Sequence, residues 1–152
     1  MFYKNKKELL YNLEKSNNYL FHGSPNKIEV FEPKQAYTFI NGQNIKDDDP
    51  AIHASPIIDI AIFMSLINRI NCPKGSYSKF EYKNNKVVFE ATKETLEQLN
   101  KPKGYIYVFE RSFFKQRDYI EYVTYKSIIY NMVIKVGIDE LPQNIELISF
   151  AS

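Results

Sequence analysis

Apolar residues recur at helical spacing in the first part of the chain and at strand spacing in the later part. Leucines at helical spacing predict an amphipathic helix over residues 5–15, with lysines on its other face. A nearly continuous apolar stretch predicts a buried helix with Ser55 as its N-cap, Pro56 as its first residue and an end near Arg69. Runs rich in β-branched and aromatic residues predict strands at residues 19–22, 51–54, 77–82, 87–89, 105–109, 119–125, 132–136 and 145–149.

Local signals between these elements predict a hairpin and one more helix. Asn84-Asn85 separates two strand-like runs and predicts a hairpin turn, and Thr92 predicts the N-cap of a short helix. The pattern over residues 26–50 predicts a segment that is mostly loop, with one strand at residues 36–40. A loop of this length is typical of either a lid over a binding site or a solvated surface segment.

The order of the elements indicates the fold class. Helices come early and strands follow without βαβ alternation, which favours an α+β fold with a mainly antiparallel sheet. A length of 152 residues predicts a single domain spanning residues 1–152.

Charge and cysteine content exclude several classes of protein. The chain has 20 basic and 18 acidic residues and a net charge of +2, so charge alone excludes a strongly basic nucleic-acid binder. One cysteine, Cys72, excludes an internal disulfide and a multi-cysteine zinc site, and indicates a reducing, cytoplasmic location. We expect no targeting or membrane segment, because the longest apolar stretch, residues 57–70, is shorter than a bilayer span.

Two histidines and one glutamate are the candidates for chemistry. His22 ends a predicted strand just before Gly23, where its ring either binds a ligand or makes an ordinary hydrogen bond at a turn. Glu121 lies within an otherwise uncharged predicted strand, where it either faces solvent by alternation or is held for a function. A structural role is favoured for His53, and neither histidine has the spacing of a metal motif, so we expect no metal.

Three segments together resemble one family. Tyr19–Ser24 (YLFHGS) resembles the strand and His-Gly-Ser/Thr motif of ADP-ribosyltransferases of the diphtheria-toxin and poly(ADP-ribose) polymerase class. Ile120–Tyr125 (IEYVTY), followed by Met132–Val136 (MVIKV), is similar to the glutamate strand of that class and the strand after it. Phe63, ten positions after His53, stands where the class has an aromatic residue. The resemblance implies an ADP-ribosyltransferase-like split antiparallel β-sheet core with a few flanking helices.

The resemblance also implies that NAD is the co-substrate and gives each matched residue a role. His22 would hydrogen-bond the adenosine ribose, Gly23 would offer its main chain to the nicotinamide amide, and Ser24 would help to hold the nicotinamide ribose. Phe63 would stack on the nicotinamide ring. Glu121 would bond the ribose 2′-OH and stabilise the oxocarbenium-like transition state, because an anion stabilises developing positive charge. The expected enzyme is a bacterial or phage-encoded mono-ADP-ribosyltransferase that modifies a macromolecular acceptor, either protein or nucleic acid.

Departures from the class leave other functions open. Phe63 replaces the usual tyrosine and Ile60 stands at a nicotinamide-binding serine, so nicotinamide would be held less firmly. An NAD glycohydrolase and a catalytically silent module that binds NAD or ADP-ribose are therefore alternatives. Tyr119, two positions before Glu121, speaks against the toxins that modify arginine or asparagine. An RNA 2′-phosphotransferase is disfavoured, because the chain has only three arginines to bind phosphates.

Overall fold

The computed structural model describes residues 5–35, 37–46 and 49–149. Within these residues the helices are α1 (Lys6–Lys15), α2 (Ile58–Leu66) and α3 (Lys93–Glu97), with short 3-10 helices at Arg111–Phe113 and Ile138–Glu140. The strands are β1 (Tyr19–Ser24), β2 (Tyr37–Ile40), β3 (Gln43–Lys46), β4 (Ile52–Ala54), β5 (Ser78–Lys83), β6 (Lys86–Thr92), β7 (Gly104–Glu110), β8 (Lys115–Gln116), β9 (Tyr122–Thr124), β10 (Met132–Val136) and β11 (Ile145–Ile148).

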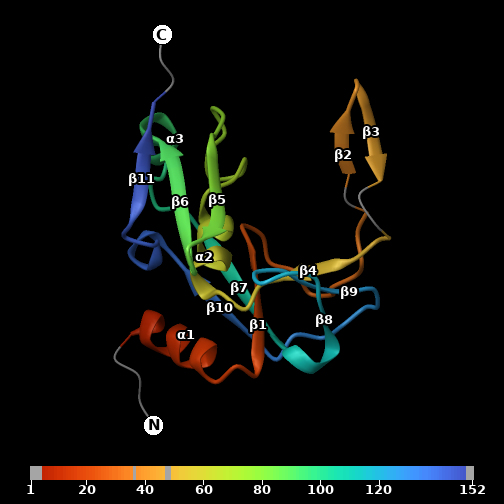
Figure 1. Ribbon diagram of the computed structural model, residues 1–152. Coiled ribbons are helices and arrows are strands. Elements are labelled where there is room, and N and C mark those ends of the chain that lie inside the picture. Colours follow the sequence, from red (N-terminus) through yellow and green to blue (C-terminus); the bar gives the residue numbers. More distant parts are fainter. Residues whose placement is uncertain (1–4, 36, 47–48, 150–152) are drawn as a thin grey trace.

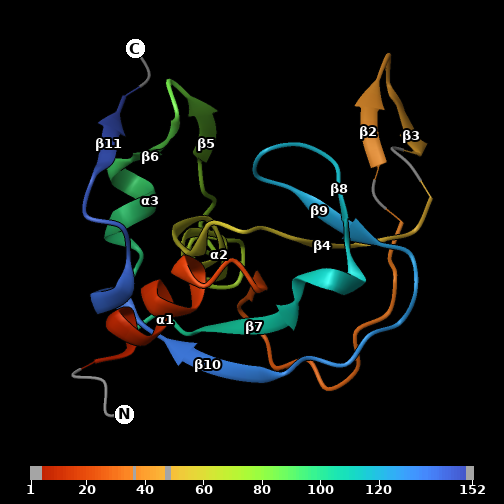
Figure 2. The same cartoon turned by 60° about the horizontal axis from the view of Figure 1, so that its bottom comes forward.

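The strands form several small sheets, and the predicted α+β class is confirmed. The described strands form three sheets of three strands each, in the orders β1-β7-β10, β11-β6-β5 and β4-β9-β8, and β2 and β3 form a separate hairpin. Among these described strands, every pairing is antiparallel except that of β11 with β6. In both views α2 lies between the β5-β6-β11 sheet and the β4-β9-β8 sheet, and the β2-β3 hairpin projects away from both (Figures 1 and 2).

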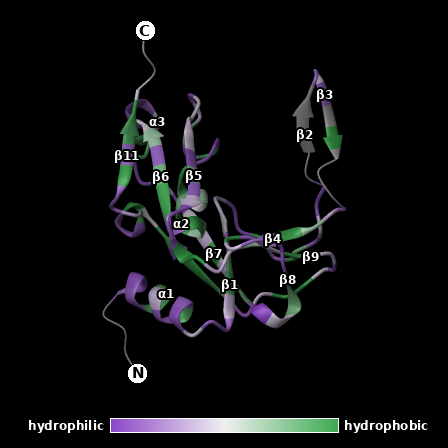
Figure 3. Ribbon diagram, viewed as in Figure 1, coloured by the Kyte–Doolittle hydropathy of each residue, from purple (hydrophilic) through white to green (hydrophobic). Residues whose placement is uncertain are grey.

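The helix α2 forms the centre of the core, as its apolar sequence predicts. One side of it packs in a cluster with Phe21 of β1 and Ile106 of β7, and another side packs with Phe89 of β6. The helix α1 differs from α2 in burial, because α1 is largely hydrophilic and Leu10 is its one buried residue (Figure 3). No helix in the described part of the chain is long and apolar enough to cross a membrane.

The bounds of α2 differ from the prediction at both ends. Ser55 does not cap the helix, because its hydroxyl accepts the N–H of Ile57, which precedes the first helical residue, at 3.2 Å. Its main chain exchanges two hydrogen bonds of 2.8 Å with Phe21 and so continues the extended run of β4. The helix begins at Ile58, whose N–H donates to the Glu14 carboxylate of α1 at 2.7 Å. It ends at Leu66, before the predicted Arg69, and the Asn68 amide donates to carbonyls of its last turn.

Two strand predictions need correction. Of the strand predicted over residues 119–125, only Tyr122–Thr124 (β9) is extended and paired, and Glu121 lies in the turn before it. Asp118 accounts for this shortening, because its carboxylate accepts the N–H groups of Ile120 and Glu121 and holds a turn. The segment predicted as loop contains the second strand β3 as well as β2, joined through Asn41 and Gly42, both with positive φ. Ala36, the first residue of the predicted strand, lies outside the described residues.

The turn and cap predictions in the second half are confirmed. Asn84 and Asn85 both have positive φ and join β5 to β6, as a tight hairpin requires. The Thr92 hydroxyl accepts the N–H of Thr95 and caps α3.

Two glycines allow α2 to lie directly on the strands beneath it. A Cβ atom at Gly23 of β1 would stand 1.9 Å from the carbonyl oxygen of Ala61, and one at Gly104 of β7 would stand 2.4 Å from the hydroxyl of Ser65. Neither site has room for a methyl group, so the contact between helix and sheet requires glycine at both positions.

We expect Gly23→Ala to lower the free energy of unfolding by about 1–3 kcal/mol or more, because α2 must move away from β1. Gly137→Ala is the control, since its nearest atom, the Pro102 carbonyl oxygen, would lie 3.9 Å from the new Cβ. The control should change stability by less than about 1 kcal/mol. Urea unfolding followed by circular dichroism measures both variants, and equal stabilities would contradict the proposed packing constraint.

Candidate active site

A cavity of about 440 Å³ opens between β1, β4, α2, β5 and the turn before β9. Its polar lining comes from the two histidines of the chain and from two carboxylates of the turn. Its apolar lining comes mainly from α2, with further side chains from β1, β4, β5 and the same turn. The lining residues are Phe21, His22, Gly23, His53, Ala54, Ser55, Ile60, Ala61, Met64, Phe80, Asp118, Ile120 and Glu121. A mostly apolar hollow with a few convergent polar groups is the usual form of a small-molecule site.

His22 enters this cavity as a neutral ring in a defined tautomer. Its Nδ1 lies 2.7 Å from the carbonyl oxygen of His53, so Nδ1 carries a proton and donates it. Burial lowers the pKa of His22, the charges of His53 and Lys34 lower it further, and the bond to the carbonyl opposes both. The ring of Phe31 packs edge-on against the imidazole at 5.2 Å between centroids. Nε2 of the neutral ring is therefore a hydrogen-bond acceptor.

Glu121 is placed by the turn that precedes β9. The Glu121 main chain is held on both sides, because its N–H donates to Asp118 at 2.8 Å and its carbonyl accepts the N–H groups of Arg117 and Asp118. Its side chain is about one third exposed, which leaves the carboxylate open to the cavity and to water. The main chain of Glu121 is thus held by hydrogen bonds, while its carboxylate is accessible from the cavity.

The carboxylate of Glu121 is bonded to His53 of β4. Nδ1 of His53 lies 2.5 Å from Oε1 of Glu121, and Nη1 of Arg117 lies 3.9 Å from the same oxygen. Pairing of β4 with β9, in which His53 lies opposite Val123, brings the imidazole within reach of the turn. His53 therefore contacts Glu121 through its side chain and His22 through its carbonyl.

Gly23 lines the cavity with its main chain. The N–H and C=O of Phe21 both bond to Ser55, on the side of β1 opposite to β7. Because alternate residues of a strand direct these groups to the same side, those of Gly23 also face away from β7 and toward the cavity. The tight contact with Ala61 excludes a side chain here, so the exposed groups at this position are main-chain ones.

Two of the residues suggested by the resemblance lie outside the cavity lining. Ser24 is buried and its hydroxyl accepts the N–H of Asn26, so it stabilises the turn after β1. Phe63 is buried and packs against Phe80 and Phe89. The structure therefore brings together His22, Gly23 and Glu121 and separates Ser24 and Phe63 from them.

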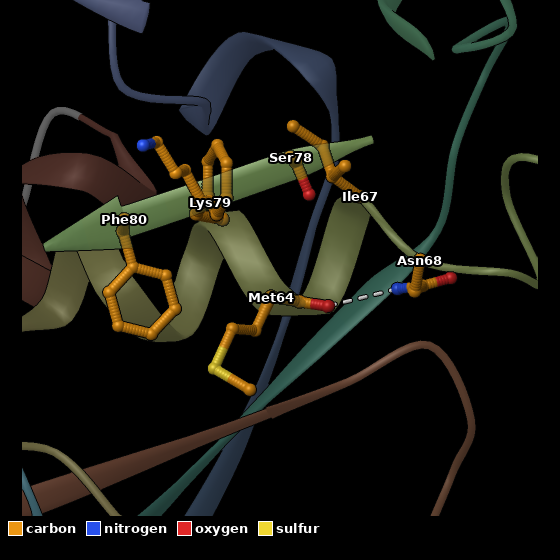
Figure 4. A pocket seen from close by; sticks show the side chains of 7 residues that line it. Met64, Ile67, Asn68, Ser78, Lys79 and Phe80 are labelled. Carbon is orange, nitrogen blue, oxygen red and sulfur yellow. Dashed lines mark hydrogen bonds between the residues drawn. The ribbon is translucent and has the colours of Figure 1, made fainter. Parts of the chain in front are cut away.

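Beside α2, Phe80 of β5 provides an aromatic ring to the cavity lining. Met64 and Phe80 project to the same side, from α2 and β5, and they also line a neighbouring hollow of about 430 Å³ that includes Phe63 (Figure 4). Phe80 is not recognisable from the sequence, because it comes from a hairpin with no motif of its own. His53 carried one weak signal: it directly precedes Ala54-Ser55, the residues that lead into α2.

Other reactive groups lie elsewhere or do not cluster. Cys72 is fully buried, its Sγ is 3.6 Å from the carbonyl oxygen of Thr95, and burial raises the pKa of its thiol. Such a thiol is a poor nucleophile. Over residues 5–35, 37–46 and 49–149, no three side chains of His, Cys, Asp or Glu gather in a way that could hold a metal ion.

Models of protein families, curated proteins and solved structures were compared with the chain, and none of them matches it. A functional proposal therefore depends on the sequence motifs and on the geometry and chemistry of the cavity.

We expect His22 to titrate below the ordinary histidine value of about 6.5, because burial disfavours its charged form. The folded state then binds fewer protons than the unfolded state between the two pKa values. The free energy of unfolding should consequently fall as the pH is lowered from about 6.5 through this interval. NMR titration of the imidazole protons measures the pKa, and His22→Asn assigns the signal. A pKa at or above 6.5 would show that the ring is not buried in this way.

Proposed function

We propose that this protein is an NAD-dependent mono-ADP-ribosyltransferase-like enzyme that cleaves the nicotinamide glycosidic bond and transfers ADP-ribose to a macromolecular acceptor. The observation that supports this best is one cavity that contains His22, Gly23 and Glu121, which come from distant parts of the chain. Each occupies a position at which the sequence resembles the His and Glu motifs of that family.

The arrangement of the sheets is consistent with the split antiparallel core that the resemblance to this family implies for the chain. The β1-β7-β10 sheet and the β4-β9-β8 sheet meet where Phe21 pairs with Ser55. The cavity lies beside this junction, with α2 along one wall. We propose the ADP-ribosyltransferase-like fold on this basis, together with the order of the motifs.

The polar groups of the cavity suit the sugars and amide of NAD. Nε2 of neutral His22 is an acceptor for a ribose hydroxyl, and the main chain of Gly23 offers a donor and an acceptor to a carboxamide. A volume of about 440 Å³ lies in the range of small-molecule sites, and the walls from Ile60, Met64 and Phe80 suit a flat ring. Phe80 thus takes the place that the resemblance assigned to Phe63.

Glu121 supplies the electrostatic part of the reaction. As the bond from the ribose carbon to the nicotinamide nitrogen breaks, its electron pair leaves with nicotinamide and the sugar becomes oxocarbenium-like. An anionic carboxylate near this carbon stabilises the transition state more than the ground state, in which the positive charge lies on the departing ring. The acceptor then attacks the sugar carbon and releases its proton to solvent, which completes the transfer.

Two related functions use the same cavity. Hydrolysis of NAD follows if water attacks in place of the acceptor, and the exposure of Glu121 favours such access. A module that binds NAD or ADP-ribose without turnover needs His22 and Gly23 but no reactive carboxylate. The bond between Glu121 and His53 speaks for the enzyme, because a purely binding site has no need of an oriented anion.

We expect Glu121→Gln to slow nicotinamide release from NAD by about 100-fold or more while leaving NAD binding intact, since the amide keeps the shape and removes the charge. Glu146→Gln, on β11, is the matched control and should release nicotinamide at the wild-type rate. Release is followed by chromatography with purified protein. Unchanged turnover in Glu121→Gln would contradict the proposed mechanism.

We expect His22→Asn to weaken NAD binding by about tenfold, because asparagine can still donate to the His53 carbonyl but no longer presents the Nε2 acceptor. Titration calorimetry with NAD measures the dissociation constant. An unaltered constant would argue against a ribose contact at His22. Tight binding to the wild type without any nicotinamide release would favour the silent module.

A further inference from the structure

We propose that His53 is the positioning residue for Glu121: its Nδ1–H holds one carboxylate oxygen and leaves the other for the nicotinamide ribose. Because this role concerns the same cavity, it rests on the proposed function. Neither the motifs nor the resemblance assigned such a role to His53, which the sequence presents as an ordinary strand residue.

Among the described residues, the polar contacts to the Glu121 carboxylate are made to a single oxygen, Oε1. Nδ1 of His53 lies 2.5 Å from Oε1, and the guanidinium of Arg117 approaches the same atom at 3.9 Å. Among the described residues no side chain or main-chain group bonds to Oε2 of Glu121. One oxygen is thus fixed by the protein, and the other keeps its lone pairs for a hydroxyl of the ligand.

His53 also connects the two ends of the site. Its carbonyl accepts the Nδ1–H of His22, and its imidazole donates to Glu121. One residue of β4 therefore sets the relative position of the group proposed to bind a ribose and the group proposed to stabilise the cation. The carbonyl contact is made by the main chain and survives substitution, so only the contact with Glu121 depends on the imidazole.

The effect of this bond on catalysis should exceed its effect on stability. Both side chains are about one third exposed, 35% for His53 and 34% for Glu121, and ion pairs at such exposed sites contribute little to the stability of the fold. Displacement of a reacting group by about 1 Å can cost 100-fold in rate. A purely structural hydrogen bond would show the reverse, with lost stability and unchanged turnover.

Three substitutions separate the bond from the shape of the side chain. Asparagine places an amide nitrogen close to the position of Nδ1, glutamine places it close to Nε2, and leucine provides bulk without a donor. We expect His53→Leu and His53→Gln to lower kcat for nicotinamide release by about 30-fold or more, with KM within about threefold. His53→Asn should recover turnover to within about fivefold of the wild type. Unchanged kcat in His53→Leu, or no recovery in His53→Asn, would overturn the assignment.

A measurement without NAD tests the same bond. Imidazole ¹⁵N NMR at about pH 8, where histidine is normally neutral, should show His53 as the Nδ1–H tautomer, with His22→Asn used to assign the signals. Glu121→Ala should return His53 to the Nε2–H form. If the wild type shows this tautomer but releases no nicotinamide, the result would contradict the proposed enzymatic activity and not the bond between His53 and Glu121. An Nε2–H tautomer in the wild type would overturn the role of His53 whatever the activity.

Discussion

The contact between α2 and the strands beneath it is the constraint on which the rest of the structure depends. Gly23 and Gly104 let the helix backbone approach β1 and β7 more closely than any side chain would allow. At this distance α2 is enclosed by apolar clusters on more than one side, which stabilises a short helix that has no side-chain cap from its own sequence. The same approach presents Ile60, Ala61 and Met64 as one wall of the cavity. A residue required for packing, Gly23, therefore also lines the candidate site.

The position of β4 follows from a second constraint, which is the pairing of Phe21 with Ser55. This bridge extends β4 past the point where a helix was expected and brings it beside β1, while β9 pairs with its other edge. His53 consequently lies between His22 and the turn that carries Glu121. The candidate site is thus a product of strand pairing between segments that lie far apart in the chain, and Asp118 shapes the remaining turn locally.

Burial and charge divide the cavity into two parts of different character. The part near His22 is half-buried and neutral, which in the proposed function suits hydrogen bonding to sugar hydroxyls. The part near Glu121 is partly exposed and anionic, which suits a reaction that develops positive charge and must admit a second reactant. Apolar walls from α2 and β5 separate these polar groups from the core, so a ligand bound there would lose much of its contact with water.

Local patterns in the sequence were sufficient to predict those structural features that depend on residues adjacent in the chain. The class of the fold, the Asn84-Asn85 hairpin, the Thr92 cap and the buried character of α2 are properties of short segments, because turn conformation, capping and burial follow from adjacent side chains. The sequence motifs also pointed to His22 and Glu121, which line one cavity and whose functional roles stay predictions. Only the tertiary structure decided that Phe80, and not Phe63, lines the cavity with His22 and Glu121, that Ser55 extends a strand, and that His53 bonds Glu121. These outcomes depend on contacts between segments distant in sequence, whose free energies outweigh local preference and leave no trace in a local pattern.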